Sequence, residues 1–113
     1  MFRAVSLLLA LLCLLPALAK LSGRPRMRQS AEHFGIPWTR YRLIGVAELA
    51  AAVGVLLGLR WPPVGIAAAA GMLVLLTGAL VLHHRAADSP REQVPAAVVL
   101  LAAIAYLAAA AAT

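Results

Sequence analysis

Lys20, Glu48 and His83 are the residues of this chain whose types and positions could support chemistry, because each lies in or beside a long apolar run. A carboxylate such as that of Glu48 costs roughly 2.5–3.5 kcal/mol at the centre of a lipid-spanning helix on insertion scales. Such an acid is expected to meet a basic partner or to take up a proton. An ammonium group, a carboxylate and an imidazole brought together could lock helices to one another, bind the head group of a ligand such as a quinone, or pass protons. We predict an intramembrane polar cluster of these three residues around Glu48.

The helical repeat around Glu48 indicates how neighbouring helices could reach it. Tyr41, Gly45 and Ala52 lie along the same helical face as Glu48. Gly45 and Ala52 have small side chains, which leave room for another helix to come close to the carboxylate. If Tyr41 marks the edge of the membrane, Glu48 lies roughly 10 Å deeper, at about 1.5 Å per residue. Lys20 ends the first apolar run, and its long side chain can extend to that depth.

His84 and Tyr41 are weaker candidates for the same cluster. On a helix the adjacent His83 and His84 point about 100° apart, so they do not converge on one metal ion. The sequence also contains no HExxH pair, no Walker glycine loop and no Ser-His-Asp arrangement. We therefore predict no catalytic residue, no metal site and no cofactor, with quinone as the alternative cofactor. The absence of these motifs favours a non-enzymatic protein and leaves an enzyme open.

The elements that position these residues follow from composition. Of the 113 residues 64% are hydrophobic and 12% are charged, which is typical of a membrane protein. Unbroken apolar runs satisfy their backbone groups as helices, whereas barrel strands would alternate. Four runs approach the length of about 20 residues that a spanning helix needs. The prediction is an all-α transmembrane four-helix bundle that forms one domain over 1–113, with spans at about 4–20, 41–59, 64–83 and 94–112.

The polar segment 21–40 is predicted to contain a short amphipathic helix between the first and second spans. Pro25 suits a first helical position, and Gly35 with Pro37 ends the pattern. Met27 and Ala31 recur at helical spacing on the apolar side. Such a helix would lie in the membrane interface. The alternative is an irregular basic loop.

Basic residues are distributed unevenly about the 41–59 run, and this distribution predicts orientation. One side of this run has few basic residues, only Arg3 and Arg60. The other side has many basic residues: Lys20, Arg24, Arg26, Arg28, Arg40, Arg42, Arg85 and Arg91. The positive-inside rule therefore places loops 21–40 and 84–93 in the cytoplasm and both termini outside, in a multi-pass protein of the cell membrane. Contact with anionic head groups explains the net charge of +6, so no nucleic-acid partner is predicted.

The first run has a competing interpretation. Residues 1–19 also resemble a secretory signal, with Arg3, an apolar stretch and the sequence Ala17-Leu18-Ala19. Cleavage after Ala19 would leave three spans. The only cysteine, Cys13, lies within this run, so the chain has no internal disulfide and no CxxC redox pair.

Small residues at helical spacing predict close helix packing. Gly54-xxx-Gly58 is a GxxxG pattern, and Ala67-xxx-Gly71 is similar. Both favour tight packing within the chain, and a homo-oligomer remains an alternative. Asp88 lies in the turn after the third run, where Arg85 or Arg91 is its expected partner.

Three sequence segments carry a resemblance to a known family. They are Arg42-Leu43-Ile44-Gly45-Val46-Ala47-Glu48-Leu49, the Gly78–His83 run followed by Arg85 and Asp88, and Lys20 with Gly23. In these segments the chain resembles the DoxX-like family of small four-helix membrane proteins. The resemblance implies a four-helix bundle of the cell membrane and gives weight to Lys20, Glu48 and His83. The family includes a subunit of a thiosulfate:quinone oxidoreductase, proteins linked to membrane thiol and oxidative-stress systems, and a receptor-assembly chaperone. The resemblance does not assign any of these activities to particular residues of this chain.

Three functions are consistent with these observations. The first is a non-enzymatic accessory subunit or assembly factor of a membrane complex, with the bilayer and a membrane protein as partners. The second is a subunit of a quinone-linked membrane oxidoreductase, for which quinone would be the cofactor and other proteins would supply electrons. The third is a small proton-coupled exporter that uses Glu48.

Overall fold

The computed structural model describes residues 2–112, and these form helices and turns without any strand. The all-helical class predicted from the sequence is therefore confirmed. The helices in chain order are α1 (Phe2–Leu21), α2 (Pro25–His33), α3 (Trp38–Leu57), α4 (Pro62–Arg85) and α5 (Pro90–Ala111).

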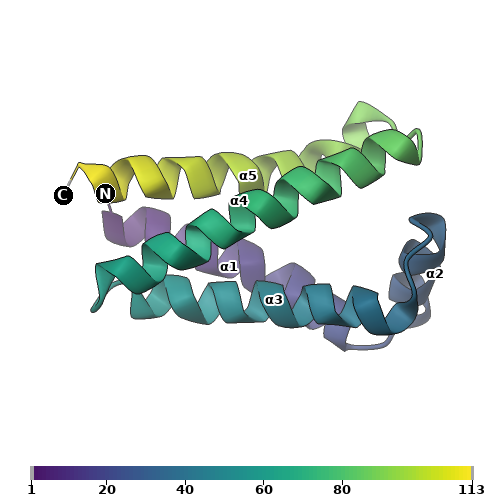
Figure 1. Cartoon of the computed structure of the whole chain (residues 1–113), viewed down its shortest axis with the longest axis horizontal. Coiled ribbons are helices and arrows are strands. Elements are labelled where there is room, and N and C mark those ends of the chain that lie inside the picture. The colour runs from purple at the N-terminus through teal and green to yellow at the C-terminus, as the bar shows by residue number, and fades with distance from the viewer. Residues whose placement is uncertain (1, 113) are drawn as a thin grey trace.

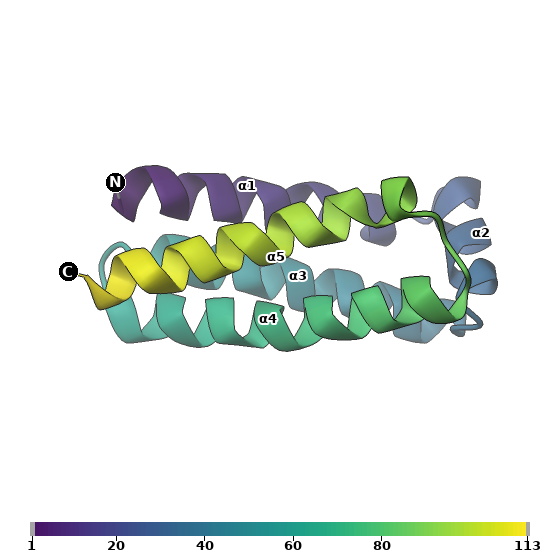
Figure 2. The same cartoon turned by 90° about the horizontal axis from the view of Figure 1, so that it is seen from above.

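The long helices lie side by side along the 42 Å axis of the molecule, and α2 stands crosswise at one end (Figures 1 and 2). Helix α1 packs against α3 and α5, and α4 packs against the same two helices. The turn between α4 and α5 lies at the same end as α2, whereas α1 begins and α5 ends at the opposite end (Figure 2). The two polar loops thus share one end of the molecule.

Proline begins three of the helices. Pro25, Pro62 and Pro90 are the first residues of α2, α4 and α5. A proline has no N–H to lose at this position, and its fixed φ suits the first helical turn. The short amphipathic helix predicted in 21–40 is present as α2, and it turns Ala31 inward at 2% exposure. The irregular-loop alternative is therefore wrong.

The outer surface of the long helices is apolar. Large exposed side chains include Leu7, Leu43 and Leu101, and such a continuous apolar surface needs lipid around it. By length and composition α1, α4 and α5 qualify as membrane spans. Helix α3 is as long as α1, but it carries Arg40, Arg42 and Glu48. The structure thus supports three of the four predicted spans, and the 41–59 span stays a prediction.

Glycines bring α3 and α4 together near the turn that joins them. A Cβ added to Gly54 would lie 2.8 Å from the Cβ of Ala68, and one added to Gly58 would lie 2.6 Å from the Cα of Gly65. The Gly54-xxx-Gly58 pattern therefore packs within the chain, as predicted. The Ala67-xxx-Gly71 pattern does not pack against another helix of the chain, because no atom lies within 4 Å of a Cβ added to Gly71. Its small residues lie on the exposed face of α4.

Candidate functional site

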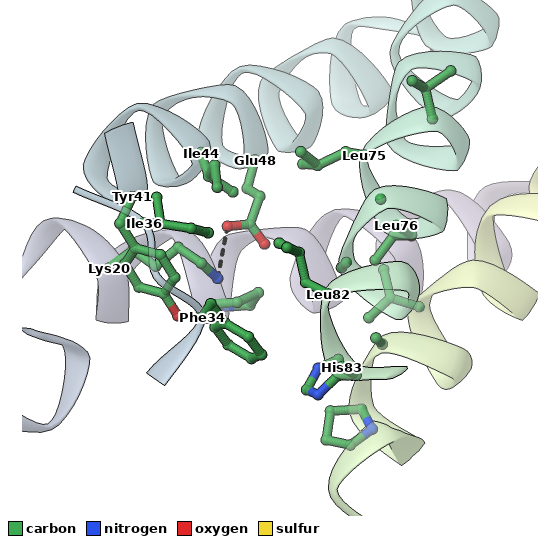
Figure 3. A pocket seen from close by; sticks show the side chains of 17 residues that line it. Lys20, Phe34, Ile36, Tyr41, Ile44, Glu48, Leu75, Leu76, Leu82 and His83 are labelled. Atoms are coloured by element: carbon green, nitrogen blue, oxygen red, sulfur yellow. Dashed lines mark ion pairs between the residues drawn. The ribbon is translucent and has the colours of Figure 1, made fainter. Parts of the chain in front are cut away.

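The buried acid meets the lysine at the end of the first helix. Lys20 Nζ lies 2.9 Å from Glu48 Oε1, and the side chains of Lys20 and Glu48 are 16% and 7% exposed (Figure 3). The ring of Tyr41 lies beside this ion pair, with its centroid 5.5 Å from the lysine Nζ. These three residues of the predicted cluster are together in the structure.

Gly45 explains why α1 and α3 can approach closely enough for this ion pair. It lies one turn before Glu48 on the buried face of α3. A Cβ added there would lie 2.9 Å from the Cβ of Lys20 and 3.4 Å from the carbonyl oxygen of Ala17. The missing side chain therefore lets the backbone of α1 pass beside the carboxylate.

A cavity of about 460 Å³ opens next to the ion pair, and we call it the ion-pair cavity. Its wall is apolar except for Lys20, Tyr41, Glu48 and His83. The lining residues are Pro16 and Lys20 of α1; Phe34 and Ile36 of the α2–α3 linker; Tyr41, Ile44 and Glu48 of α3; Val74, Leu75, Leu76, Gly78, Ala79, Leu82 and His83 of α4; and Pro95, Ala96 and Val99 of α5. Volumes of roughly 300–1,000 Å³ are usual for small-molecule pockets.

Two prolines inside helices lie on the wall of the ion-pair cavity. Pro16 interrupts α1 and Pro95 interrupts α5. A proline within a helix removes one backbone hydrogen bond, and its ring pushes against the carbonyl of the residue four positions earlier. In each helix the carbonyl four residues before the proline therefore lacks its usual helical N–H donor, although the helix continues through the proline.

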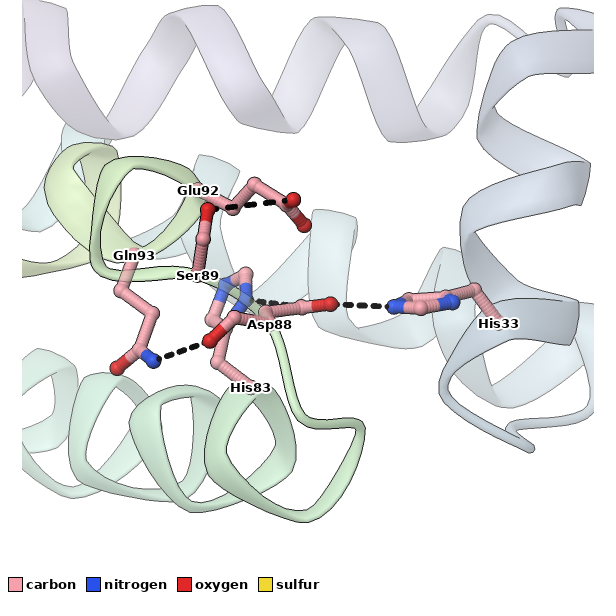
Figure 4. Close-up of polar contacts among 6 residues, drawn as sticks. All are labelled: His33, His83, Asp88, Ser89, Glu92 and Gln93. Atoms are coloured by element: carbon pink, nitrogen blue, oxygen red, sulfur yellow. Dashed lines mark hydrogen bonds and ion pairs between the residues drawn. The ribbon is translucent and has the colours of Figure 1, made fainter.

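His83 lies on the cavity wall, but Asp88 is its hydrogen-bonding partner. His83 Nδ1 is 2.7 Å from Asp88 Oδ2, and His33 Nε2 is 2.7 Å from Asp88 Oδ1 (Figure 4). Because an ionised carboxylate only accepts hydrogen bonds, each imidazole donates one. Asp88 therefore links the end of α2 to the end of α4. We call these three residues the histidine–aspartate bridge.

The bridge holds the α2–α3 linker over the ion-pair cavity. The ring of Phe34, which follows His33 directly, packs edge-on against the ring of His83 at 5.1 Å between centroids. Phe34 and Ile36 line the cavity on this side (Figure 3). The cavity is thus covered at its polar end by a segment that the bridge fastens.

Hydrogen bonding lowers the pKa of the Asp88 carboxyl below its ordinary value. The bond with His33 has the largest effect, partial burial opposes it, and the bond with His83 lowers the pKa again. The carboxylate form is therefore favoured while both imidazoles donate to it.

The turn after α4 places Asp88 against His83. Ala87 has φ 58°, the left-handed conformation that glycine usually supplies. The N–H of Ala87 donates to the carbonyl of His84, and that of Asp88 donates to the carbonyl of His83. This is the Schellman arrangement that ends many helices. It returns the chain so that Asp88 lies next to the imidazole of His83.

The residues of the predicted cluster have different surroundings, although Lys20, Tyr41, Glu48 and His83 all line the ion-pair cavity. Lys20, Tyr41 and Glu48 are together, whereas the hydrogen bond of His83 goes to Asp88. His84 is exposed and is not part of the cavity wall. The expected pairing of Asp88 with an arginine is also wrong, because the ion pairs of this carboxylate are with histidines. Within 2–112 no group of three or more His, Cys, Asp or Glu side chains is arranged to hold a metal ion.

A sequence model described as the DoxX-like family matches residues 4–109, which is nearly the whole chain. The chain belongs to the DoxX-like family. Searches of curated proteins and of solved structures gave no significant match. In this DoxX-like chain the matched region includes the ion pair, the cavity wall and the histidine–aspartate bridge. Family membership and the apolar helices identify a membrane protein.

Proposed function

We propose that this DoxX-like protein is a non-enzymatic accessory subunit or assembly factor of a membrane complex, and that it binds a lipid-soluble ligand in the ion-pair cavity. The observation that carries the proposal is a cavity of about 460 Å³ with apolar walls and one buried Lys20–Glu48 pair. Pockets that bind small molecules combine these features, since a few polar groups fix the head of a ligand and the apolar wall holds the rest.

The contacts of the polar side chains favour binding over catalysis. Lys20 pairs with Glu48, and His83 donates to Asp88. Tyr41 presents its ring to the lysine. These groups are held by one another, which suits the orientation of a ligand head.

The fourth span is part of the same proposal. Helix α3 has 20 residues, which at about 1.5 Å per residue gives roughly 30 Å, the thickness of a bilayer core. Lys20 neutralises Glu48, and Arg40 and Arg42 near the start of α3 can extend to the head groups. The chain would then cross the membrane with α1, α3, α4 and α5.

The arrangement of the loops supports the proposed orientation. Helix α2 and the α4–α5 turn lie at one end of the molecule (Figure 2), and the basic residues concentrate there. We place this end in the cytoplasm of a cell-membrane protein, with both termini outside. Burial of Cys13 and Ala17 at 0% exposure supports α1 as a retained helix, which an intact-mass measurement of the mature protein would test.

Purification in mild detergent, followed by identification of bound small molecules and proteins, tests the proposed function. The variants are Glu48→Gln and, as control, Glu32→Gln, which removes the same charge from an exposed position on α2. The wild type and Glu32→Gln are expected to retain the ligand. Glu48→Gln should retain roughly tenfold less, because a charged hydrogen bond contributes about 1.5–3 kcal/mol.

Two results would overturn the proposal. One is equal retention of small molecules by Glu48→Gln and the wild type. The other is a reaction catalysed by the purified protein alone and abolished by Glu48→Gln. A partner protein that stays in stoichiometric amount with the wild type and Glu32→Gln, and leaves with Glu48→Gln, would support the accessory role.

A further inference from the structure

The ion-pair cavity reaches the lipid-facing side of α4. Val74, which lines the cavity, is 76% exposed on the outer surface. Gly78, also on the wall, is exposed, and no atom lies within 4 Å of a Cβ added to it. The same residues therefore belong to the cavity wall and to the exposed side of α4, which faces the acyl chains in the proposed membrane arrangement.

The packing of α3 and α4 explains this lateral opening. The two helices touch near the turn that joins them, at Gly54 with Ala68 and at Gly58 with Gly65. They diverge toward the end of the molecule where α2 lies (Figure 1). The cavity occupies the space between Glu48 of α3 and the Val74–Leu82 stretch of α4.

The inner end of the cavity presents an acceptor and donors for a ligand. Glu48 is 6% exposed, and its Oε1 pairs with Lys20. Its other oxygen points toward Leu82 across the cavity (Figure 3) and accepts no hydrogen bond from residues 2–112. The ammonium of Lys20 has three N–H donors, and the ion pair uses one of them.

We propose that a neutral single-chain amphiphile enters the ion-pair cavity from the bilayer between α3 and α4. This inference rests on the proposed function. A head with a hydroxyl and a carbonyl group, as in a monoacylglycerol, donates to Glu48 Oε2 and accepts from Lys20 Nζ. Its tail lies along Val74 and Gly78 into the lipid.

The charge of the pair and the size of the cavity select this ligand class. Lys20 and Glu48 together have no net charge, so an anionic head would lie against the carboxylate and a cationic head would compete with the lysine. Either would leave an uncompensated charge in a poorly solvated place. The volume of about 460 Å³ is in the lower part of the usual range, which suits a single chain.

Photolabelling in phosphatidylcholine nanodiscs tests the route of access. The probe is a monoacylglycerol that carries a diazirine and an alkyne in its acyl chain. Gly78→Leu fills the opening, and Gly71→Leu is the matched control. Both glycines are exposed on α4, about two turns apart, without an atom near the added Cβ, but only Gly78 lines the cavity.

The wild type and Gly71→Leu are expected to be labelled equally, on peptides that include Val74 and Leu82. Labelling of Gly78→Leu should fall by roughly tenfold or more. Equal labelling of Gly78→Leu would overturn lateral access. Val74→Trp, which also obstructs the opening, gives the same test if Gly78→Leu does not fold.

Competition tests the ligand class. Unlabelled monoacylglycerol should displace the probe, and the fatty acid and the alkylamine of the same chain length should not. Equal displacement by either charged compound would overturn the neutral-head inference. A different result would overturn the proposed function itself, namely that native mass spectrometry finds no small molecule of any class bound to the wild type. Bound molecules together with unchanged labelling of Gly78→Leu would leave the proposed function standing and remove only the lateral route.

Discussion

At the scale of single residues, the pairing of Lys20 with Glu48 decides what the acid in α3 can do. The two groups lie 2.9 Å apart and are mostly buried. Such pairs add little net stability compared with apolar residues of similar size, yet removing one partner is costly because the other charge is left buried. Net stability therefore does not explain the pair, whereas the ligand binding proposed above would give it a role.

The first prediction compares single and double replacements of this pair. Lys20→Met leaves Glu48 without its partner and should lower the free energy of unfolding by about 3 kcal/mol. The double variant Lys20→Met/Glu48→Leu should lie within about 1 kcal/mol of the wild type. Unfolding in mixed micelles, followed by circular dichroism, measures these two variants and the single variant Glu48→Leu. A double variant that loses the sum of the two single effects would show that the side chains do not interact.

The second prediction concerns the pH dependence of the histidine–aspartate bridge. The pKa of Asp88 is lowered in the folded protein, chiefly by His33, so the unfolded state binds more protons at mildly acidic pH. The bridge is thus stable above the ordinary aspartate pKa of about 3.9 and is lost as pH falls through the lower folded value.

Amide exchange of α2, corrected for intrinsic rates, measures the state of the bridge. In the wild type, protection of α2 should fall as pH drops below about 4. Asp88→Asn should show reduced protection already at pH values where the carboxylate is ionised, with no further change on acidification. Equal protection of α2 in the two proteins at neutral pH would contradict the bridge.

At the scale of elements, the ends of α2 and α4 show how similar turns arise from different residues. Gly35 ends α2 with φ 68°, and Ala87 ends α4 with φ 58°. The glycine adopts this conformation freely, whereas the alanine does so at a cost of roughly 1–2 kcal/mol. The turn after α4 is therefore held by its surroundings, chiefly the contacts of Asp88 with the two histidines.

The third prediction follows from this strain. Ala87→Gly should raise the free energy of unfolding by about 0.5–1 kcal/mol. The backbone strain that glycine relieves in the folded state is larger than the free-energy cost of the more flexible unfolded chain. The control is Ala86→Gly at φ −80°, where glycine brings only the entropy cost of about 0.5–1 kcal/mol. Thermal unfolding compares the two variants. Destabilisation by both would mean that Ala87 is not strained.

At the scale of the whole molecule, the two polar loops share one end (Figure 2), which we propose faces the cytoplasm. The fourth prediction uses Gln29→Cys on exposed α2 and Ala112→Cys after α5, at opposite ends of the molecule. In intact cells an impermeant maleimide should label Ala112→Cys and leave Gln29→Cys unlabelled. Buried Cys13 gives little background. Labelling of both variants, or of Gln29→Cys alone, would contradict the orientation.

The sequence predicts the fold better than it predicts the site. Long apolar runs and proline starts determine the helices, and the glycine beside Glu48 indicates a close helix neighbour. The partners of the histidines could not be predicted, because they depend on a left-handed turn at an alanine and on where α2 folds back. The cavity is likewise a property of helix divergence, which no residue pattern encodes.

The most direct test of the account is the amount of ligand that the Lys20→Met/Glu48→Leu variant keeps. Native mass spectrometry of the protein released from nanodiscs counts bound small molecules per chain. We predict that this variant folds as stably as the wild type and yet retains few or none of the molecules that the wild type retains. Equal occupancy in the two proteins would contradict the claim that the buried pair holds the head of a ligand.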